Sequence, residues 1–516
     1  MSDWSAGYVA DIGYTHGVYP ELNPLRVRFA FLNAGLVFPE IACSCELGFG
    51  QGVSVNVHAA ASGSEWHGTD FNPVQAGFAR ALAGASGADA HLTDESFAAF
   101  CHRADLPDFD FICLHGVWSW ISDENRHVLV DFIRRKLKVG GVLYVSYNTQ
   151  PGWAALAPVR ELMTRHYASM TVPSAGTGER IGQSLDFAGR LLATNPGFAQ
   201  ANPQVAGRMA LLQAADKAYL AHEYFNRDWQ PMSFPMLADW LEPAKVAFAC
   251  PATYVEHHEA VLVTPEQGEF LRAVADPALK QLAFDFMINQ QFRRDYWVRG
   301  ARRLAPLERA RLLREQRVVL VIAPDDVAYT VKAGQIEVGL NEAKHRPVVE
   351  ALADHRPHTI GELESTCAAA GLTALQTQQA VFLLAGTGQV QPAQDAAPAE
   401  RAKAACLRLN EHLVGLAEHG GDISYLASPV TGGGIPVPRI HQLFLLCLRR
   451  GHRSTGDLVA FVMALAGEQN VRLHQGDQPA PAGQQAALLE RHANDFLQHR
   501  MAVLKALAVI PQDYPQ

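Results

Sequence analysis

Apolar and polar positions alternate between two periods over the first 150 residues of the chain. Helical spacing of apolar residues is visible at 25–36, 74–83 and 125–138. Strand-like apolar runs separate these helices, at 41–47, 65–69, 109–114 and 141–147, and a further short strand ends before Asp94. Because strands that alternate with helices form parallel sheets with helical crossovers, the pattern predicts an α/β, Rossmann-like domain over residues 1–155.

The pattern changes after Pro151-Gly152. Residues 156–220 are mainly helical in pattern, which predicts a helical insertion. Residues 221–303 combine a helix at 236–241 with short strands at 245–249 and 260–264, which predicts a middle α+β domain.

Residues 304–516 predict a mainly helical C-terminal domain. Within it, 346–392 has the pattern of three helices followed by a turn and a strand, an order typical of winged helices. Residues 393–404 are rich in Ala, Pro and Gln and predict a linker, and a glycine-rich loop at 431–434 interrupts the helical pattern of the last hundred residues.

Composition narrows the choice of partners and compartment. The chain has 52 Asp and Glu residues and 43 Lys and Arg residues, a net charge of −9. Because it has no excess of basic residues, we do not expect it to bind nucleic acid. The eight cysteines are scattered without zinc-type pairing, which favours a reducing, cytoplasmic setting. No apolar run is long enough to cross a bilayer, and the first residues do not resemble a signal peptide.

A glycine loop follows the first predicted strand. The run Glu46-Leu47-Gly48-Phe49-Gly50-Gln51-Gly52 places three glycines at alternate positions, where the backbone can approach a ligand closely. Val53 stands where a dinucleotide fingerprint has its last glycine, a residue less needed for a ligand without phosphate. Glu46, at the end of the strand, can accept from a ligand ammonium group.

Two further acids follow the next two predicted strands. Asp70 ends one strand and can bind both hydroxyls of a ribose, and Asp94 lies after another, within reach of an adenine amino group. Each acid alone is also a common turn or N-cap residue. Because Glu46, Asp70 and Asp94 occur in order at the carboxyl ends of successive strands, they predict an S-adenosylmethionine site together with Gly48, Gly50 and Gly52.

At these residues the chain resembles a known family, the bacterial methyltransferases with a methyltransferase regulatory domain, which include the rickettsial outer-membrane-protein lysine methyltransferases. The matching runs are 46–52, 68–70, 109–120, 145–153, 222–224, 293–295 and 426–430. The resemblance implies a class I methyltransferase, a regulatory role for the middle domain and a protein lysine as the acceptor. It also allows a homodimer.

The acceptor side of the site is predicted from positions that line this pocket in the class. These positions are Tyr14, Tyr19, His115 and Tyr147. His115 can also contact the cofactor. An aromatic pocket suits a lysine, which must lose a proton, whereas a hydroxyl or carboxyl acceptor needs a positioned base such as His115. A small-molecule or saccharide O- or N-methyltransferase and a non-catalytic cofactor-binding scaffold remain alternatives, and core packing is the alternative for Tyr14 and Tyr19.

Two remaining features concern metals and partners. His257-His258-Glu259 lacks a third ligand at workable spacing, so no metal site is expected. Residues 304–516 show no second catalytic motif, and we expect them either to recruit a macromolecular substrate or to cover apolar surface.

Overall fold

A computed structural model describes residues 8–9, 12–13, 15–172, 174–333, 336–469, 474–475, 478–479 and 481–515. Its centre is a seven-stranded sheet in the order β3-β2-β1-β4-β5-β7-β6. The strands β1 to β5 run parallel, and β7 is antiparallel to both β5 and β6. The strands are β1 (Cys43–Leu47), β2 (Glu65–Thr69), β3 (Ala90–Thr93), β4 (Phe109–Leu114), β5 (Leu137–Asn148), β6 (Val246–Pro251) and β7 (Phe292–Arg299).

Helices cover both faces of the sheet, as a central parallel sheet requires. On one face lie α1 (Pro24–Asn33), α2 (Val53–Ser62) and α3 (Pro73–Ser86), whose apolar side chains meet Trp66, Phe111 and Tyr144. On the other lie α4 (Phe97–Cys101), α5 (Asp123–Lys136) and α11 (Phe234–Leu241). These layers confirm the predicted Rossmann-like α/β fold, and the predicted strands at 65–69 and 109–114 have the bounds of β2 and β4.

The middle segment contributes to the same sheet. The strands β6 and β7 complete its far edge. The predicted strand at 245–249 corresponds to β6, whereas no strand was predicted at 292–299, because this run is rich in Arg. The predicted strand at 260–264 is wrong: α12 (Glu259–Leu262) lies there, followed by α13 (Pro265–Ala273) and α14 (Pro277–Met287). A short apolar run does not distinguish a strand from a buried helical turn, and Thr264 caps the next helix.

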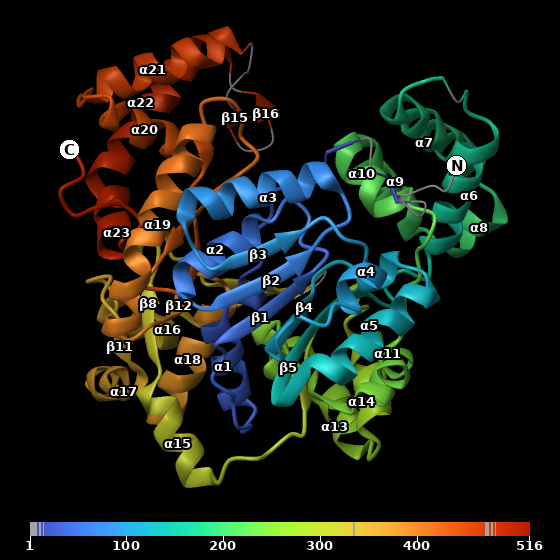
Figure 1. Ribbon diagram of the computed structural model, residues 1–516, viewed down its shortest axis with the longest axis horizontal. Helices are drawn as coiled ribbons and strands as arrows, with labels where there is room; N and C mark the ends of the chain where they lie inside the picture. The colour runs from blue at the N-terminus through green and yellow to red at the C-terminus, as the bar shows by residue number, and fades with distance from the viewer. Residues whose placement is uncertain are drawn as a thin grey trace.

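The helical segment between β5 and α11 has its own apolar core, built around Met163, Ile181, Leu185 and Leu220. Figure 1 shows it to one side of the sheet, beyond the strand ends and beside the N-terminal segment. It consists of α6 (Ala157–Ser169), α7 (Thr177–Ala193), α8 (Gly197–Ala201), α9 (Gln204–Ala214) and α10 (Lys217–Tyr224).

After β7 the chain forms α15 (Pro306–Glu315) and a small antiparallel sheet in the order β11-β8-β12. Three helices pack beside this sheet, and Thr359 and Thr373 begin two of them with capping boxes. The elements are β8 (Arg317–Leu320), β9 (Thr330–Ala333), β10 (Ile336–Gly339), α16 (Glu342–Ala351), β11 (His358–Thr359), α17 (Ile360–Ala368), α18 (Ala374–Gly386) and β12 (Val390–Ala393).

The last part of the chain packs against α2 and α3 (Figure 1). The predicted linker at 393–404 is wrong, because α19 (Ala396–Leu416) begins there: Ala and Glu favour helix, and Pro398 lies in the first turn. The glycine-rich loop at 431–434 joins two strands within a segment expected to be helical. The elements are β13 (Tyr425–Ser428), β14 (Gly433–Pro436), α20 (Arg439–Arg449), α21 (Thr455–Glu468), β15 (His474–Gln475), β16 (Gln478–Pro479), α22 (Gln485–Asp495) and α23 (Met501–Ala506).

The helix α2 is enclosed from two sides as a result. The sheet lies on one side, and α19 and the β13–β14 hairpin lie on the other. Every residue from Val53 to Ala61 is buried. Among the described residues, no helix is long and apolar enough to cross a membrane.

Candidate active site

The glycine loop joins β1 to α2 in a backbone conformation that L side chains rarely adopt. Gly48, Gly50 and Gly52 have φ angles of +76°, +57° and +68°. A Cβ on Gly48 would lie 2.5 Å from Cγ2 of Val117, and one on Gly52 would clash with Ala79 of α3. Glycine is therefore favoured by conformation at all three positions, and by space at Gly48 and Gly52.

Glu46 lies in β1 with its side chain in the protein interior. It is 1% exposed, and within the described part of the chain neither of its carboxylate oxygens has a hydrogen-bond partner. Burial, with a smaller contribution from the charge of Asp70, raises the pKa of Glu46 to about 8. A buried carboxylate without a partner is unfavourable unless a donor or cation is supplied, so Glu46 is suited to bind a positively charged group of a ligand.

Asp70 follows β2 and holds the glycine loop. Its Oδ2 accepts from the Gly50 amide at 2.9 Å, and its Oδ1 accepts from the Asn72 amide at 3.0 Å. Burial raises the pKa of Asp70 to about 6 in spite of these two bonds. A carboxylate has about four acceptor positions, so Asp70 can still accept from two ligand hydroxyls.

A cavity opens beside this loop at the carboxyl ends of β1, β2 and β4. The arrowheads of β1 and β2 point toward the side where α10 lies (Figure 1). Ligands of open α/β sheets bind at this end. The cavity is lined among others by Tyr8, Gly50, Asp70, Glu95, Phe97 and His115.

Asp94 does not line this cavity. Its side chain is 46% exposed and faces Arg80, with Oδ1 3.4 Å from the guanidinium. The neighbouring Glu95 and Ser96 line the cavity instead, and Glu95 is held by Arg103 at 3.1 Å. The adenine contact of Asp94 stays a prediction. Sequence reasoning missed Glu95 because it selected only the first acid after the strand, which ends at Thr93.

His115 and Tyr19 are brought together at the cavity. Their rings stack with centroids 3.5 Å apart, and the Nδ1 atom of His115 lies 2.9 Å from the hydroxyl of Tyr144. Burial lowers the pKa of His115 to about 3, although the charge of Glu21 opposes this. His115 is therefore uncharged at neutral pH and a weak base.

Tyr147 and Tyr14 differ from this pair. Tyr147 is fully buried in the core on the α5 side of the sheet, and its hydroxyl donates to Oδ2 of Asp295 at 3.0 Å. Since strand residues alternate between faces, its ring lies opposite that of Tyr144. Tyr14 lies outside the described residues.

Two residues that sequence reasoning did not select also belong to this region. Tyr8 lines the cavity, and its ring lies 5.5 Å from that of His222 on α10. Burial raises the pKa of Tyr8 and of Tyr19, and the charge of Glu223 on α10 raises both further. The N-terminal run of aromatic residues was the available signal for Tyr8, and the matching run 222–224 was the available signal for Glu223.

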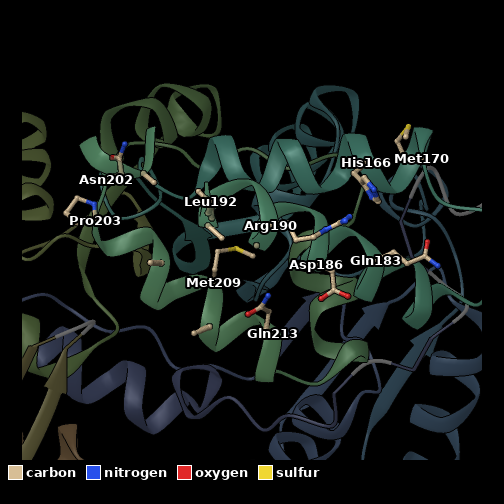
Figure 2. Close-up of a pocket in the computed structure, with 15 residues that line it drawn as sticks. His166, Met170, Gln183, Asp186, Arg190, Leu192, Asn202, Pro203, Met209 and Gln213 are labelled. Carbon is tan, nitrogen blue, oxygen red and sulfur yellow. The ribbon is translucent and has the colours of Figure 1, made fainter. Parts of the chain in front are cut away.

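A separate groove lies among α6, α7, α8 and α9 (Figure 2). His166, Asp186, Arg190 and Met209 are among its lining residues. No residue of the glycine loop lines it, so it is distinct from the cavity at the strand ends.

Comparisons with known proteins agree with this geometry. Residues 45–145 match a family described as a methyltransferase domain, and residues 216–299 match one described as a predicted methyltransferase regulatory domain. An uncharacterised protein of Synechocystis is 34% identical over 512 residues, covering 98% of this chain and 99% of its own length. An uncharacterised protein of Rickettsia prowazekii is 26% identical over 55% of this chain and 51% of its own.

One solved structure shares the fold over nearly the whole length. PKMT2 from Rickettsia typhi, in complex with AdoHcy, superposes with a TM-score of 0.65 over 96% of this chain and 99% of that protein. The sequence identity is 16%, so this likeness concerns the fold.

Proposed function

The chain belongs to the class I S-adenosylmethionine-dependent methyltransferases with a methyltransferase regulatory domain, and we propose that it methylates lysine side chains of a protein. The observation that carries the proposal is the composition of the acceptor side. Tyr8, Tyr19 and an uncharged His115 lie beside the cavity, and a carboxylate, Glu223, lies close to both tyrosines.

On the cofactor side, two carboxylates would bind different groups of the cofactor. Glu46 would accept from the α-ammonium group of S-adenosylmethionine, and Asp70 would accept from its ribose hydroxyls. The glycine loop lets the backbone approach the cofactor closely. Bound S-adenosylmethionine supplies the methyl group, which the acceptor nitrogen takes with its lone pair as the bond to sulfur breaks and a neutral sulfide leaves.

A lysine must lose a proton before it can accept a methyl group. From an ordinary pKa near 10.4 this costs roughly 4–5 kcal/mol at neutral pH. Tyr8 and Tyr19 present aromatic rings that can bind the ammonium form. The buried surroundings then favour the neutral amine and lower its pKa.

We assign to Glu223 the role of the base that takes the proton from the lysine. Glu223 neighbours His222 of α10, whose Nε2 atom lies 3.0 Å from the carbonyl oxygen of Ile12 and whose ring lies 5.5 Å from that of Tyr8, so this part of α10 contacts the segment that carries Tyr8. Burial raises the pKa of Glu223 to about 7, a value suited to a base that works near neutral pH. His115, with its much lower pKa, is a weaker candidate for this step.

The test is a transfer assay with methyl-labelled cofactor and a lysate of the host cell. We expect the label in protein, in a form that survives mild base and is identified as methyl-lysine by mass spectrometry. Label that base removes would indicate carboxyl methylation, and label confined to small molecules would replace the proposal by small-molecule methylation. The Asp70→Ala variant is the control for cofactor-dependent labelling.

The role of Glu223 has its own readout. With the wild-type protein the rate should rise with pH through an inflection near 7, because the base must be deprotonated. Glu223→Gln should lower turnover about 100-fold and remove the inflection while cofactor affinity is retained. Glu179→Gln, an exposed acid on α7, should leave the rate and its pH profile unchanged.

A further inference from the structure

A second group of polar side chains lies at the opposite end of the sheet from the cavity. Cys43 and Glu65 are the first residues of β1 and β2 and are register partners. His67 of β2 is paired in the same way with His91 of β3. Residues paired across neighbouring strands share a face, as do residues two apart along a strand, so all four side chains lie on one face of the sheet.

The ligand atoms of Cys43 and His67 lie close to the carboxylate of Glu65, whereas the Nε2 atom of His91 is 2.9 Å from Oδ1 of Asp89. One ligand atom each from Cys43, Glu65 and His67 lies within 4.8 Å of the other two. The Nε2 atom of His67 is 2.7 Å from Oε1 of Glu65, and that of His91 is 3.8 Å from the same oxygen. The two imidazole rings stack with centroids 4.7 Å apart.

We propose that Cys43, Glu65 and His67 bind a divalent transition-metal ion of the zinc class, with His91 next to the fourth position. A thiolate, a carboxylate and imidazole nitrogens are the ligands zinc takes in proteins. Tetrahedral bonds of about 2.0–2.3 Å place ligand atoms roughly 3.2–3.8 Å apart. The present separations therefore require small side-chain rotations, which the 39% exposure of Glu65 allows.

The surroundings are consistent with a metal site. Asp110 accepts from the backbone amides of Ala42 and Cys43 at 3.1 and 3.0 Å, which fixes the chain that carries the thiol. Cys43 is buried, whereas the side chain of His91 is 56% exposed, so an ion can enter from the outer edge.

The metal would bring the thiol and the carboxylate to one ion. A bound divalent ion deprotonates a coordinating thiol and attracts both the thiolate of Cys43 and the carboxylate of Glu65. The cluster was missed in the sequence because Cys43 lies 22 residues before Glu65 and His91 lies 24 residues after His67, so that they meet only through strand pairing.

The experiment uses the full chain, stripped of metal by a chelator and titrated with Co²⁺, which replaces zinc and reports thiolate ligation by an intense near-ultraviolet absorption band. We expect one equivalent of Co²⁺ to produce the band and Zn²⁺ to remove it. Cys43→Ser should abolish the band, and Cys447→Ser, a buried cysteine on α20, should keep it.

A second variant tests the proposal if Cys43→Ser does not fold. His67→Gln keeps the thiol and should weaken Co²⁺ binding by about 100-fold or more, since even removal of an outer partner of a ligand costs 10- to 100-fold. Absence of the band in the wild-type protein, or its persistence in Cys43→Ser, would overturn the proposal. Neither result depends on methyl transfer.

Discussion

Two surfaces of the sheet domain are covered by other parts of the chain, and they are covered in different ways. The outer side of α2 meets the C-terminal half through apolar side chains, in one core that joins Val53 and Val57 to Leu409 and Leu443. The carboxyl ends of the strands meet the N-terminal segment and α10 through tyrosines, a histidine and carboxylates.

The buried polar groups of the two surfaces also differ in their hydrogen-bond partners. Beside α2, Gln394 donates to the carbonyl of Ala61 at 2.8 Å and the Cys406 thiol donates to that of Ala60 at 3.5 Å. At the strand ends, the buried carboxylate of Glu46 has no hydrogen-bond partner among the described residues. Beside α2, Oδ1 of Asn56 and Nδ1 of His58 also have no hydrogen-bond partner among the described residues, so the two surfaces differ in the charge of the unpartnered group and in the cavity that only the second one borders.

This difference bears on the role of the C-terminal half. Residues 304–516 were expected either to recruit a large substrate or to cover apolar surface. The burial of α2 from Val53 to Ala61 supports the covering role, because removal of α19 would expose this apolar helix. Truncation near residue 304 is therefore a poor test of recruitment, and point substitutions are preferable.

The largest expected effect is on stability. Leu409→Ala removes a fully buried side chain from the core that α19 shares with α2, and should lower the free energy of unfolding by about 2–5 kcal/mol. Leu307→Ala, at a position 87% exposed, should change it by less than about 0.5 kcal/mol. Thermal unfolding of both variants measures the difference.

A contrary result would change the comparison. If Leu409→Ala unfolded at the same temperature as the wild-type protein, the C-terminal half would not stabilise α2. The result would then favour recruitment of a substrate as the role of this half. If both variants were destabilised equally, exposure in the structure would not be the deciding factor.

The second-largest expected effect is a loss of cofactor affinity in a variant that still folds. Asp70→Ala removes the carboxylate that lines the cavity and should weaken binding of adenosylhomocysteine about 10- to 100-fold, the range for a hydrogen bond to a charged group. Asp94→Ala should change the affinity less than about threefold, because its carboxylate faces Arg80 outside the cavity. Calorimetry on both variants decides between them, with thermal unfolding as the check on folding. A tenfold loss in Asp94→Ala would support the adenine contact predicted from the sequence.

Local patterns sufficed for the sheet and for the glycine loop. The alternation of strands and helices predicted β1, β2, β4 and β5, because each apolar run is long enough to be buried and is bounded by turn residues. Glu46, Gly50 and Asp70 could be selected because each lies directly at a strand end, where the fold class itself fixes the position.

Residues whose position depends on distant contacts could not be predicted. Tyr147 lies in the same strand as Tyr144, β5, but faces the opposite side, and the strand's burial on both faces leaves no polar alternation to show this. Glu223 reaches the acceptor side only because α10 packs on Tyr8 and Ile12, which are more than 200 positions away. The antiparallel strands β6 and β7 join the sheet after a long helical segment that separates them from β5.

The smallest expected effect concerns protons taken up or released when the cofactor binds. The pKa of Glu46 is raised to about 8 by burial and by Asp70, so at neutral pH a large fraction of this carboxyl group is protonated in the free protein. An ammonium group binds to the charged form and lowers the pKa, so binding should release a proton from Glu46. Affinity for adenosylhomocysteine should therefore rise from about pH 6 to about pH 7.5, by at most about tenfold per pH unit. This window lies above the pKa of Asp70, which is about 6. Calorimetry in buffers of different ionisation enthalpy counts the protons, and Glu46→Gln should bind more weakly at pH 7.5 with no release. An affinity that is constant over this range in the wild-type protein would mean that Glu46 does not bind the ammonium group, and that its isolation in the core has another cause.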